Sequence, residues 1–382
     1  MKRFSLAIAL AFLLSGGSLR AEEPKVSVSG YVLTDFVYYV NEEGQYSEQL
    51  VSGDYALAAN EGYNAFEITR GYLTFSAQLT DKVLASITTD LRTDSDGYRR
   101  IFAKFAFVEF RDLAPHTKIR FGLQEPPWAF SDAELWRYRM VEQGFYSYWG
   151  TFSTADFGVS LLGDVLDGLF KYHFAILNGE GVSGIETERF KEYVARFTFD
   201  LGSADKIRFY PSAGYSSNHH GEQGLRDEVF MTGAGLDLLG RVHLAGEYFQ
   251  GIYGMEAGEL PLVRGVWPAG ALDMIEFADP ALLLVDEKDV NFAGWAAYAD
   301  IKLLDKLNLF GRYDLYDPNT DPDFDRDGET LWTAGIAYHP IDNLWVTLDY
   351  REFSFQEPDP DHDNDKELPS TRAVYTHWKI AY

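Results

Sequence analysis

The sequence has no cysteine among its 382 residues. A chain without cysteine has no disulfide framework, no thiolate metal site and no covalently attached c-type haem. Basic residues are also few: 33 Lys and Arg stand against 59 Asp and Glu, which gives a formal net charge of −26, and the basic residues are scattered. Since nucleic acid is bound through basic surfaces, it is excluded as an expected partner.

Long apolar runs are scarce as well. One opens the chain over Phe4–Leu14, after Lys2 and Arg3 and before small residues that end at Ala21. This is the layout of a secretory signal peptide, and it is shorter than the ~20 apolar residues that a membrane-spanning helix needs. We therefore expect residues 1–21 to be a signal peptide and residues 22–382 to form one exported domain, whose formal charge is −29 once three cations are removed. No later run reaches helix length, which excludes a helical membrane protein.

Aromatic side chains are plentiful, with 8 Trp, 24 Tyr and 28 Phe. An exported, acidic chain of this kind is either a large soluble β protein or an outer-membrane barrel, whose polar lumen hides its membrane character from average hydropathy. The periodicity of the sequence separates the two classes. Over 70–79, and again over 83–92 after a short turn, apolar and polar side chains alternate. This alternation predicts two strands, each with one apolar face, joined as a hairpin.

The same alternation repeats to the end of the chain. With ends placed to within ~2–4 residues, we predict sixteen strands at 25–40, 65–79, 82–92, 101–112, 117–124, 155–163, 168–178, 189–201, 205–217, 228–238, 240–253, 289–303, 306–316, 329–339, 343–355 and 370–382.

The connections between these strands alternate strictly between short and long. The long polar ones are 41–64, 93–100, 125–154, 179–188, 218–227, 254–288, 317–328 and 356–369. A soluble sandwich has no reason to sort its loops in this way. The pattern predicts an all-β fold, a 16-stranded antiparallel transmembrane β-barrel with short periplasmic turns and long external loops. Such a barrel pairs every backbone group in lipid, and at this size it encloses an aqueous channel.

The end of the chain agrees with this class. Apolar and aromatic side chains alternate over 371–382, and the chain stops at Tyr382. This resembles the signal by which the barrel-assembly machinery recognises outer-membrane proteins. Aromatic residues near strand ends, such as Tyr38, Tyr248, Tyr313, Trp332 and Tyr350, are typical of interfacial girdles. The expected location is the outer membrane of a Gram-negative bacterium, with lipid and lipopolysaccharide as neighbours.

Several short motifs resemble one family of channels. They are Arg70–Phe75 (RGYLTF), Thr80–Lys82 (TDK), Ala106–Phe110 (AFVEF), Ile119–Gln124 (IRFGLQ) and Pro126–Trp128 (PPW). Together they are similar to the phosphate-selective porin O/P family, best over about 65–130. The resemblance implies a sixteen-stranded outer-membrane channel, a homotrimer, and a third loop that narrows the pore.

The predicted lumen differs from that family in its charges. The resemblance implies an arginine ladder and a lysine cluster for phosphate, which this chain lacks. The bases predicted to face the lumen are Arg70, Arg92, Lys104, Lys118, Arg120, Lys171, Arg196, Arg208, Arg312, Arg351 and Lys379. The acids are Asp90, Asp156, Glu192, Asp200, Asp237, Glu247, Asp300, Asp314 and Asp349. The wall is therefore mixed in sign, and phosphate selectivity is not carried over.

The third long loop, 125–154, is the candidate for the pore constriction. A pore selects solutes by its width and by the charges at its narrowest ring. We expect Glu125, Asp132, Glu134 and Glu142 to face Arg137 and Arg139, with wall arginines Arg70, Arg92 and Arg120 opposite. The alternative is a set of ordinary surface ion pairs on an outward loop. A capping-box pattern at 131–134 predicts a short helix over 132–141.

The aromatic residues of this loop have two interpretations. They either pin the loop to the wall, which we favour, or form a surface on which sugars stack. The residues are Trp128, Phe130, Trp136, Tyr146, Tyr148 and Trp149.

Two external loops are strongly acidic. One carries Asp321, Asp323, Asp325 and Asp327 before a glycine, and the next carries Asp359, Asp361, Asp363 and Asp365. The first resembles half of an EF-hand loop, but Ala334 stands at position twelve counted from Asp323, where an EF-hand has its bidentate Glu ligand. The loops are either solvated and mutually repelling or a shared calcium site, and calorimetric titration with calcium decides between these. No other cofactor is expected.

The predicted function is passive diffusion of small hydrophilic solutes or ions, with a weak preference for cations because of the acidic mouth. The eight histidines are scattered and form no nucleophile-and-base set, so we do not expect an enzyme. Three alternatives stay open: an adhesin barrel acting through its external loops, a sleeve that holds a partner protein, and an anion- or phosphate-selective channel.

Overall fold

The computed structural model describes residues 24–40, 62, 64–93, 98–129, 132–182, 184, 186, 189–220, 225–254, 289–320, 328–355 and 370–382. The predicted signal peptide, 1–21, lies outside these residues, so its boundary stays a prediction. No helix in the described part of the chain is long and apolar enough to cross a membrane.

The described residues form one closed antiparallel sheet. Its strands are β1 (Lys25–Tyr39), β2 (Asn64–Thr80), β3 (Val83–Thr93), β4 (Arg99–Arg111), β5 (Thr117–Gln124), β6 (Asp156–Val165), β7 (Phe170–Leu177), β8 (Glu192–Phe199), β9 (Leu201–Gly202), β10 (Ile207–His220), β11 (Leu225–Leu238), β12 (Val242–Gly254), β13 (Asp289–Leu304), β14 (Leu307–Asp317), β15 (Glu329–Ile341), β16 (Leu344–Phe355) and β17 (Thr371–Ala381). Both β8 and β9 pair with β10, so they are two parts of one strand interrupted at Asp200. The predicted sixteen strands are confirmed, with ends shifted by a few residues.

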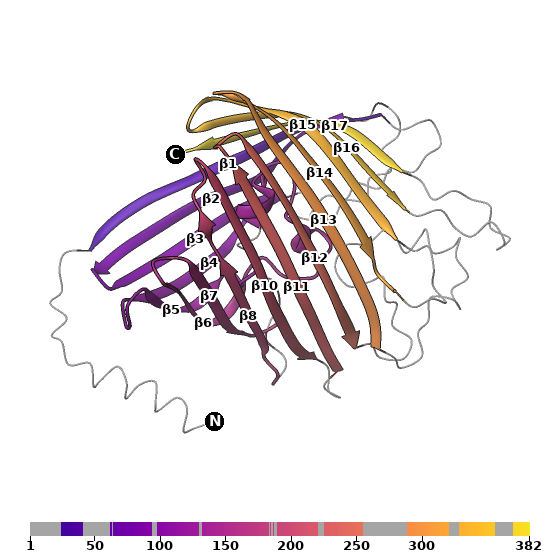
Figure 1. The fold of residues 1–382 in the computed structure, drawn as a ribbon. Coiled ribbons are helices and arrows are strands. Elements are labelled where there is room, and N and C mark those ends of the chain that lie inside the picture. The colour runs from indigo at the N-terminus through magenta and orange to yellow at the C-terminus, as the bar shows by residue number, and fades with distance from the viewer. Residues whose placement is uncertain are drawn as a thin grey trace.

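The sheet closes because its first and last strands pair with each other. Strand β1 lies between β2 and β17, and the remaining strands follow in chain order. Gly30 and Tyr382 exchange two backbone hydrogen bonds of 3.0 Å at the seam. Figure 1 shows the tilted strands around a common interior. Closure leaves no unpaired edge among the described strands, which is the condition for placing a sheet in lipid.

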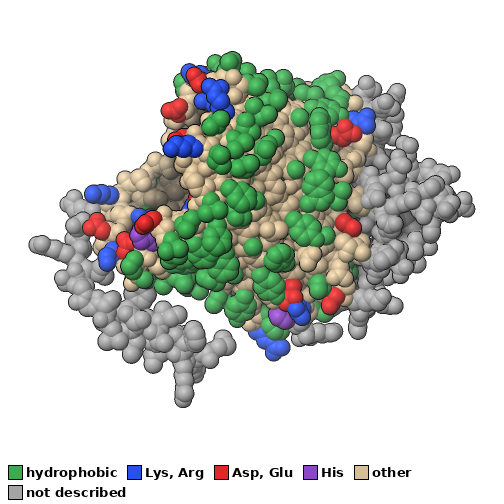
Figure 2. Space-filling model, in the orientation of Figure 1, with side chains coloured by type: hydrophobic (Ala, Val, Ile, Leu, Met, Phe, Trp, Pro, Cys, Tyr) green, Lys and Arg blue, Asp and Glu red, His purple; other side chains and the backbone are tan. Residues whose placement is uncertain are grey.

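Side chains alternate between the outer face and the lumen. In β3, Ile87 is 53% exposed on the outside, whereas its neighbour Thr88 and also Asp90 are buried inside. Figure 2 shows hydrophobic side chains spread over the outer wall, with charged ones mostly toward its ends. Trp378 and Tyr382 point outward from the last strand, and the predicted girdle residue Trp332 is exposed as well. The alternation gives the wall an apolar exterior and a polar interior.

Most of the buried apolar side chains belong to one cluster inside the barrel. It is made by the segment between β5 and β6 together with the inner faces of several wall strands, mainly β10–β16. An empty sixteen-stranded ring would have no such core, because its inner wall would face water. The segment that supplies this core is the predicted constriction loop.

Candidate pore constriction

The loop 125–154 lies inside the barrel. Its aromatic side chains Trp136, Phe145 and Trp149 are at most 1% exposed. Its described residues include the π-helix η1 (Asp132–Trp136) and the α-helix α3 (Phe145–Tyr148). The loop leaves the wall after β5 and returns at β6, where Gln124 still pairs with Asp156. It is therefore an insertion at the end of an intact hairpin, folded inward.

The helix predicted over 132–141 is shorter than expected. It ends at Trp136, since Arg137 has a φ of +64°, which is outside the helical region. This backbone turn directs the Arg137 guanidinium to the wall, where Nη2 donates a hydrogen bond of 2.7 Å to Asp237 Oδ1 and one of 3.2 Å to the Tyr210 hydroxyl. A tertiary ion pair fixes the end of the helix, and the local capping pattern could not reveal it.

Aromatic stacking holds the loop against β12–β16. The ring of Tyr138 stacks on Phe310 with centroids 4.3 Å apart, and Trp149 stacks on Tyr316 at 5.0 Å. Phe145 packs against Phe249 at 4.7 Å. Such pairs contribute ~0.5–1.5 kcal/mol each beyond the area they bury. The aromatic residues thus pin the loop to the wall, which was the favoured interpretation; Phe130 lies outside the described residues.

Glycines in the wall make room for these side chains. A Cβ atom added at Gly214 would lie 2.1 Å from Trp128 Cζ2, and one at Gly233 would lie 3.0 Å from Leu135 Cδ1. A Cβ atom at Gly294 would lie 3.1 Å from Phe145 Cζ. At these glycines no side chain projects from the inner wall of β10, β11 and β13, which leaves room for the loop. The sequence alone could not reveal this surface, because a glycine in a strand is equally typical of a bulge or a tight bend.

Polar contacts add to the apolar docking on the same wall. The Tyr138 hydroxyl donates a hydrogen bond of 3.0 Å to Asp300 Oδ1, and the Trp149 indole donates one of 3.0 Å to Asp314 Oδ2. Burial and the Asp300 carboxylate raise the pKa of Tyr138 well above its ordinary value, so its hydroxyl stays protonated and remains a donor. The Arg312 guanidinium, which is bound to Asp314, also donates to the backbone carbonyl of Gln143.

Two of the four loop acids, Glu134 and Glu142, pair with arginines of the wall that were not among those expected. Glu134 lies 3.3 Å from Arg208 on β10, and Glu142 lies 2.5 Å from Arg351 on β16. Glu125 is exposed at the start of the loop, and Asp132 begins η1. Both arginine partners were assigned to the lumen from sequence, but their pairing across the barrel could not be inferred.

The expected wall arginines are engaged on their own strands or on adjacent ones. Arg70 Nη1 donates 2.7 Å to the Tyr72 hydroxyl and lies 3.7 Å from Asp90. Arg120 pairs with Glu109 at 2.9 Å. Arg92 lies over the Phe102 ring at 4.7 Å. Of these three, Arg70 lines the opening described next.

A space remains between the loop and the opposite wall. About 620 Å³ of free space, partly open to solvent, separates loop residues 139–143 from β1, β2, β16 and β17. Three bases and three acids border it, together with one histidine: Arg70, Arg139, Arg351, Asp35, Glu67, Glu142 and His377. His377 lies between two carboxylates, with Nδ1 2.9 Å from Asp35 and Nε2 3.2 Å from Asp349. Fixed charges of both signs in such a narrow opening favour hydrated polar solutes over apolar ones.

The described residues contain no group of three or more His, Asp or Glu side chains that could hold a metal ion. The two acidic loops with Asp321, Asp323, Asp325 and Asp327 and with Asp359, Asp361, Asp363 and Asp365 lie outside the described residues. Calcium binding there stays a prediction.

Comparison with known proteins gives a match of fold only. No protein-family model and no curated protein matches the chain. The outer-membrane channel DcaP of Acinetobacter baumannii is 12% identical, with a TM-score of 0.62 over 95% of this chain and 99% of that one. The anion-selective porin from Comamonas acidovorans is 13% identical, with a TM-score of 0.61 over 94% and 100%. Salmonella typhi OmpF, in a complex with daunomycin, is 13% identical, with a TM-score of 0.58 over 94% and 98%.

The protein therefore has the fold of outer-membrane porins. The predicted resemblance to the phosphate-selective O/P family is not confirmed, since no family model matches. Within the motifs that suggested it, Trp128 is buried beside Gly214 and packs on Tyr146 with centroids 5.2 Å apart. The Trp128 position of the motif is therefore explained by the packing of the loop. It does not indicate which solute the protein transports.

Proposed function

We propose that the protein is a porin of a Gram-negative outer membrane, through which small hydrophilic solutes diffuse passively beside the loop 125–154. The observation that carries this proposal is the loop itself, which is held in the lumen beside a charged space. The closed sheet with an apolar exterior and the porin-like fold support the location in the outer membrane.

Planar bilayer recordings test this proposal. A porin gives steady, ohmic conductance steps when the purified barrel inserts. An electrically silent barrel that is shown to be folded would refute the proposal and favour the adhesin or the sleeve for a partner protein.

The charges at the opening support a general pore rather than a phosphate-selective one. Arg70, Arg139 and Arg351 are accompanied by Asp35, Glu67 and Glu142 in the same lining. A selective anion site needs an excess of bases, and this lining is balanced.

Replacing Arg139 by Glu is expected to shift the reversal potential in a KCl gradient toward the potassium equilibrium potential. The change removes one positive charge from the opening and adds a negative one, which favours cations. Arg372→Glu is the matched control, because Arg372 faces outward from β17 beside Glu352 and should leave selectivity near that of the wild type. Equal reversal potentials for Arg139→Glu and the wild type would remove Arg139 from the constriction.

We also propose a homotrimer, in which copies of the chain meet at the sector around β5–β8. Strands β5 and β7 have only eight residues each, whereas a strand needs ~9–11 to cross a bilayer. The outer face of this sector is dense in rings, with Phe174 and Phe197 at 5.3 Å and Phe170 and Phe197 at 5.7 Å. Figure 2, in the orientation of Figure 1, shows hydrophobic side chains gathered on the outer wall. One solved match, OmpT of Vibrio cholerae, is described as a trimer form.

The mass of the protein in detergent, measured by light scattering with the detergent contribution subtracted, tests the trimer. A mass of three copies supports it, and a mass of one copy overturns it.

A further inference from the structure

A second space adjoins the constriction on its external side. It has about 290 Å³ of free volume, partly open to solvent, and lies among the outer ends of β1, β16 and β17 and helix α3. Tyr39, the last residue of β1, and Thr371, the first of β17, border it. Arg351 and Tyr375 line both this space and the constriction, so the two spaces are neighbours. We call it the aromatic pocket.

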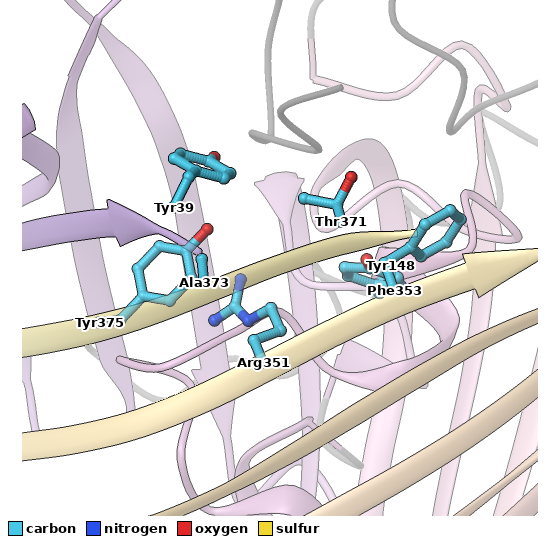
Figure 3. A pocket seen from close by; sticks show the side chains of 7 residues that line it. All are labelled: Tyr39, Tyr148, Arg351, Phe353, Thr371, Ala373 and Tyr375. Carbon is cyan, nitrogen blue, oxygen red and sulfur yellow. The ribbon is translucent and has the colours of Figure 1, made fainter. Parts of the chain in front are cut away.

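The aromatic pocket has rings on two opposite sides. Figure 3 shows Tyr39 and Tyr375 on one side, Tyr148 and Phe353 on the other, and Arg351 between them. The Arg351 guanidinium lies 4.4 Å from the centroid of the Tyr375 ring. Aromatic side chains on two sides of a pocket can contact the faces of a ring-shaped ligand, because these faces then meet carbon rather than water.

Hydroxyl groups complete the lining. Tyr39, Tyr148, Tyr375 and Thr371 each bring one. The hydroxyls of Tyr39 and Tyr375 bond to each other. A hydroxyl both donates and accepts, so this lining is suited to a ligand whose edge carries hydroxyls. A purely apolar ring would leave these groups without partners when it displaced water.

The pocket offers no free charge to an ionic ligand. Its one ionic side chain, Arg351, is neutralised by Glu142 at 2.5 Å and donates 2.8 Å to the carbonyl of Val141. The Arg351 Nε–H is buried and has no acceptor among the residues that the structure describes. A neutral ligand with oxygen acceptors satisfies this site, whereas an anion would have to compete with Glu142.

We propose that the aromatic pocket binds the pyranose ring of a neutral sugar on its way to the constriction. Such a ring has apolar faces made of C–H groups and an edge made of hydroxyls, which matches the two kinds of lining. The proposal rests on the proposed porin function and adds a substrate class to it. Among the loop aromatics for which sugar stacking was the second interpretation, Tyr148 is the one that lines this pocket.

The test uses single-channel recordings of the full mature protein with D-glucose or with sorbitol. Sorbitol has nearly the same size and the same kind of hydroxyls, but it is acyclic and lacks the ring. Glucose is expected to interrupt the current in a saturable way, and sorbitol only to reduce it in proportion to viscosity. Each channel is compared with its own sugar-free record.

Tyr375→Leu is the variant that removes one ring and one hydroxyl from the pocket, and it is expected to raise the half-saturating glucose concentration about tenfold. Tyr253→Leu is its matched control, since Tyr253 is a buried ring that stacks on Phe292 at 4.0 Å and does not line the pocket. The control is expected to keep the wild-type glucose response. A folded, conducting channel that responds equally to glucose and sorbitol overturns the sugar site and leaves the porin intact. An equal glucose response of Tyr375→Leu and Tyr253→Leu also overturns it, whereas a silent barrel refutes the porin itself.

Discussion

Replacing residues 128–152 by a short glycine-serine linker is expected to raise the single-channel conductance severalfold. The loop is an insertion beyond a closed hairpin, because Gln124 and Asp156 pair at the ends of β5 and β6. The barrel wall therefore keeps its hydrogen bonds when the loop is removed. A sixteen-stranded ring without an inward loop encloses a wide aqueous channel. Conductance in planar bilayers and the uptake of larger solutes into liposomes both measure the change.

The matched control for this excision is a linker of the same kind in place of residues 356–369, which the sequence predicts to be another external loop. Its conductance should stay near that of the wild type. The excised barrel is expected to unfold more easily, since the rings of Phe249 and Phe310 lose their partners on the loop. If a folded, excised barrel conducts like the wild type, another segment forms the narrowest point.

The strands could be predicted because a barrel imposes a simple rule on the chain. Each residue faces either lipid or lumen, and the period of two is visible in one strand at a time, as over Val83–Thr93. The alternation of short and long connections can then be recognised without knowing which residues are in contact. The rule also placed Arg208, Arg312 and Arg351 on the lumen face, where the structure has them.

The contacts of the constriction could not be predicted because they join residues far apart in the chain. Glu142 and Arg351 are 209 positions apart, and Arg312 and Gln143 are 169 apart. A sequence shows which face a side chain occupies but not its height in the barrel, which depends on the stagger of all the strands between. Of the three arginines that we expected opposite the loop, Arg70 lines the space beside it, whereas Arg92 and Arg120 contact side chains of adjacent strands.

The interruption between β8 and β9 shows the same limit on a smaller scale. The alternation of side chains predicted one strand over 189–201, but Asp200 breaks the pairing. Its carboxylate accepts hydrogen bonds of 2.6 Å from Lys171 and of 2.7 and 2.8 Å from Arg208. The Lys171 partner belongs to β7 and the Arg208 partner to β10. The alternation pattern of a single strand cannot predict these partners, because they lie on other strands.

Replacing Arg312 by Met is expected to lower the free energy of unfolding by ~3–5 kcal/mol, because it leaves the Asp314 carboxylate buried without its cation. Both side chains have no exposed surface, and Arg312 Nε donates 2.8 Å to Asp314 Oδ1. The guanidinium also lies 5.2 Å from the centroid of the Trp136 ring and 5.4 Å from that of the Tyr148 ring. Removing it is therefore expected to weaken the packing of the loop against the wall. Unfolding of the protein by urea in micelles, followed by tryptophan fluorescence, measures the loss of stability. An increase in single-channel current noise in bilayers reports greater motion of the loop.

Two further variants separate the buried charge from the loss of packing. Adding Asp314→Leu to Arg312→Met removes the stranded carboxylate, and the double variant should regain much of the lost stability, as apolar replacements of buried ion pairs often do. Arg372→Met breaks the half-exposed pair with Glu352, for which the expected loss is only ~0–1 kcal/mol. If Arg312→Met is no less stable than Arg372→Met, the buried pair does not anchor the loop, and the aromatic contacts and the other ion pairs of the loop hold it in the lumen.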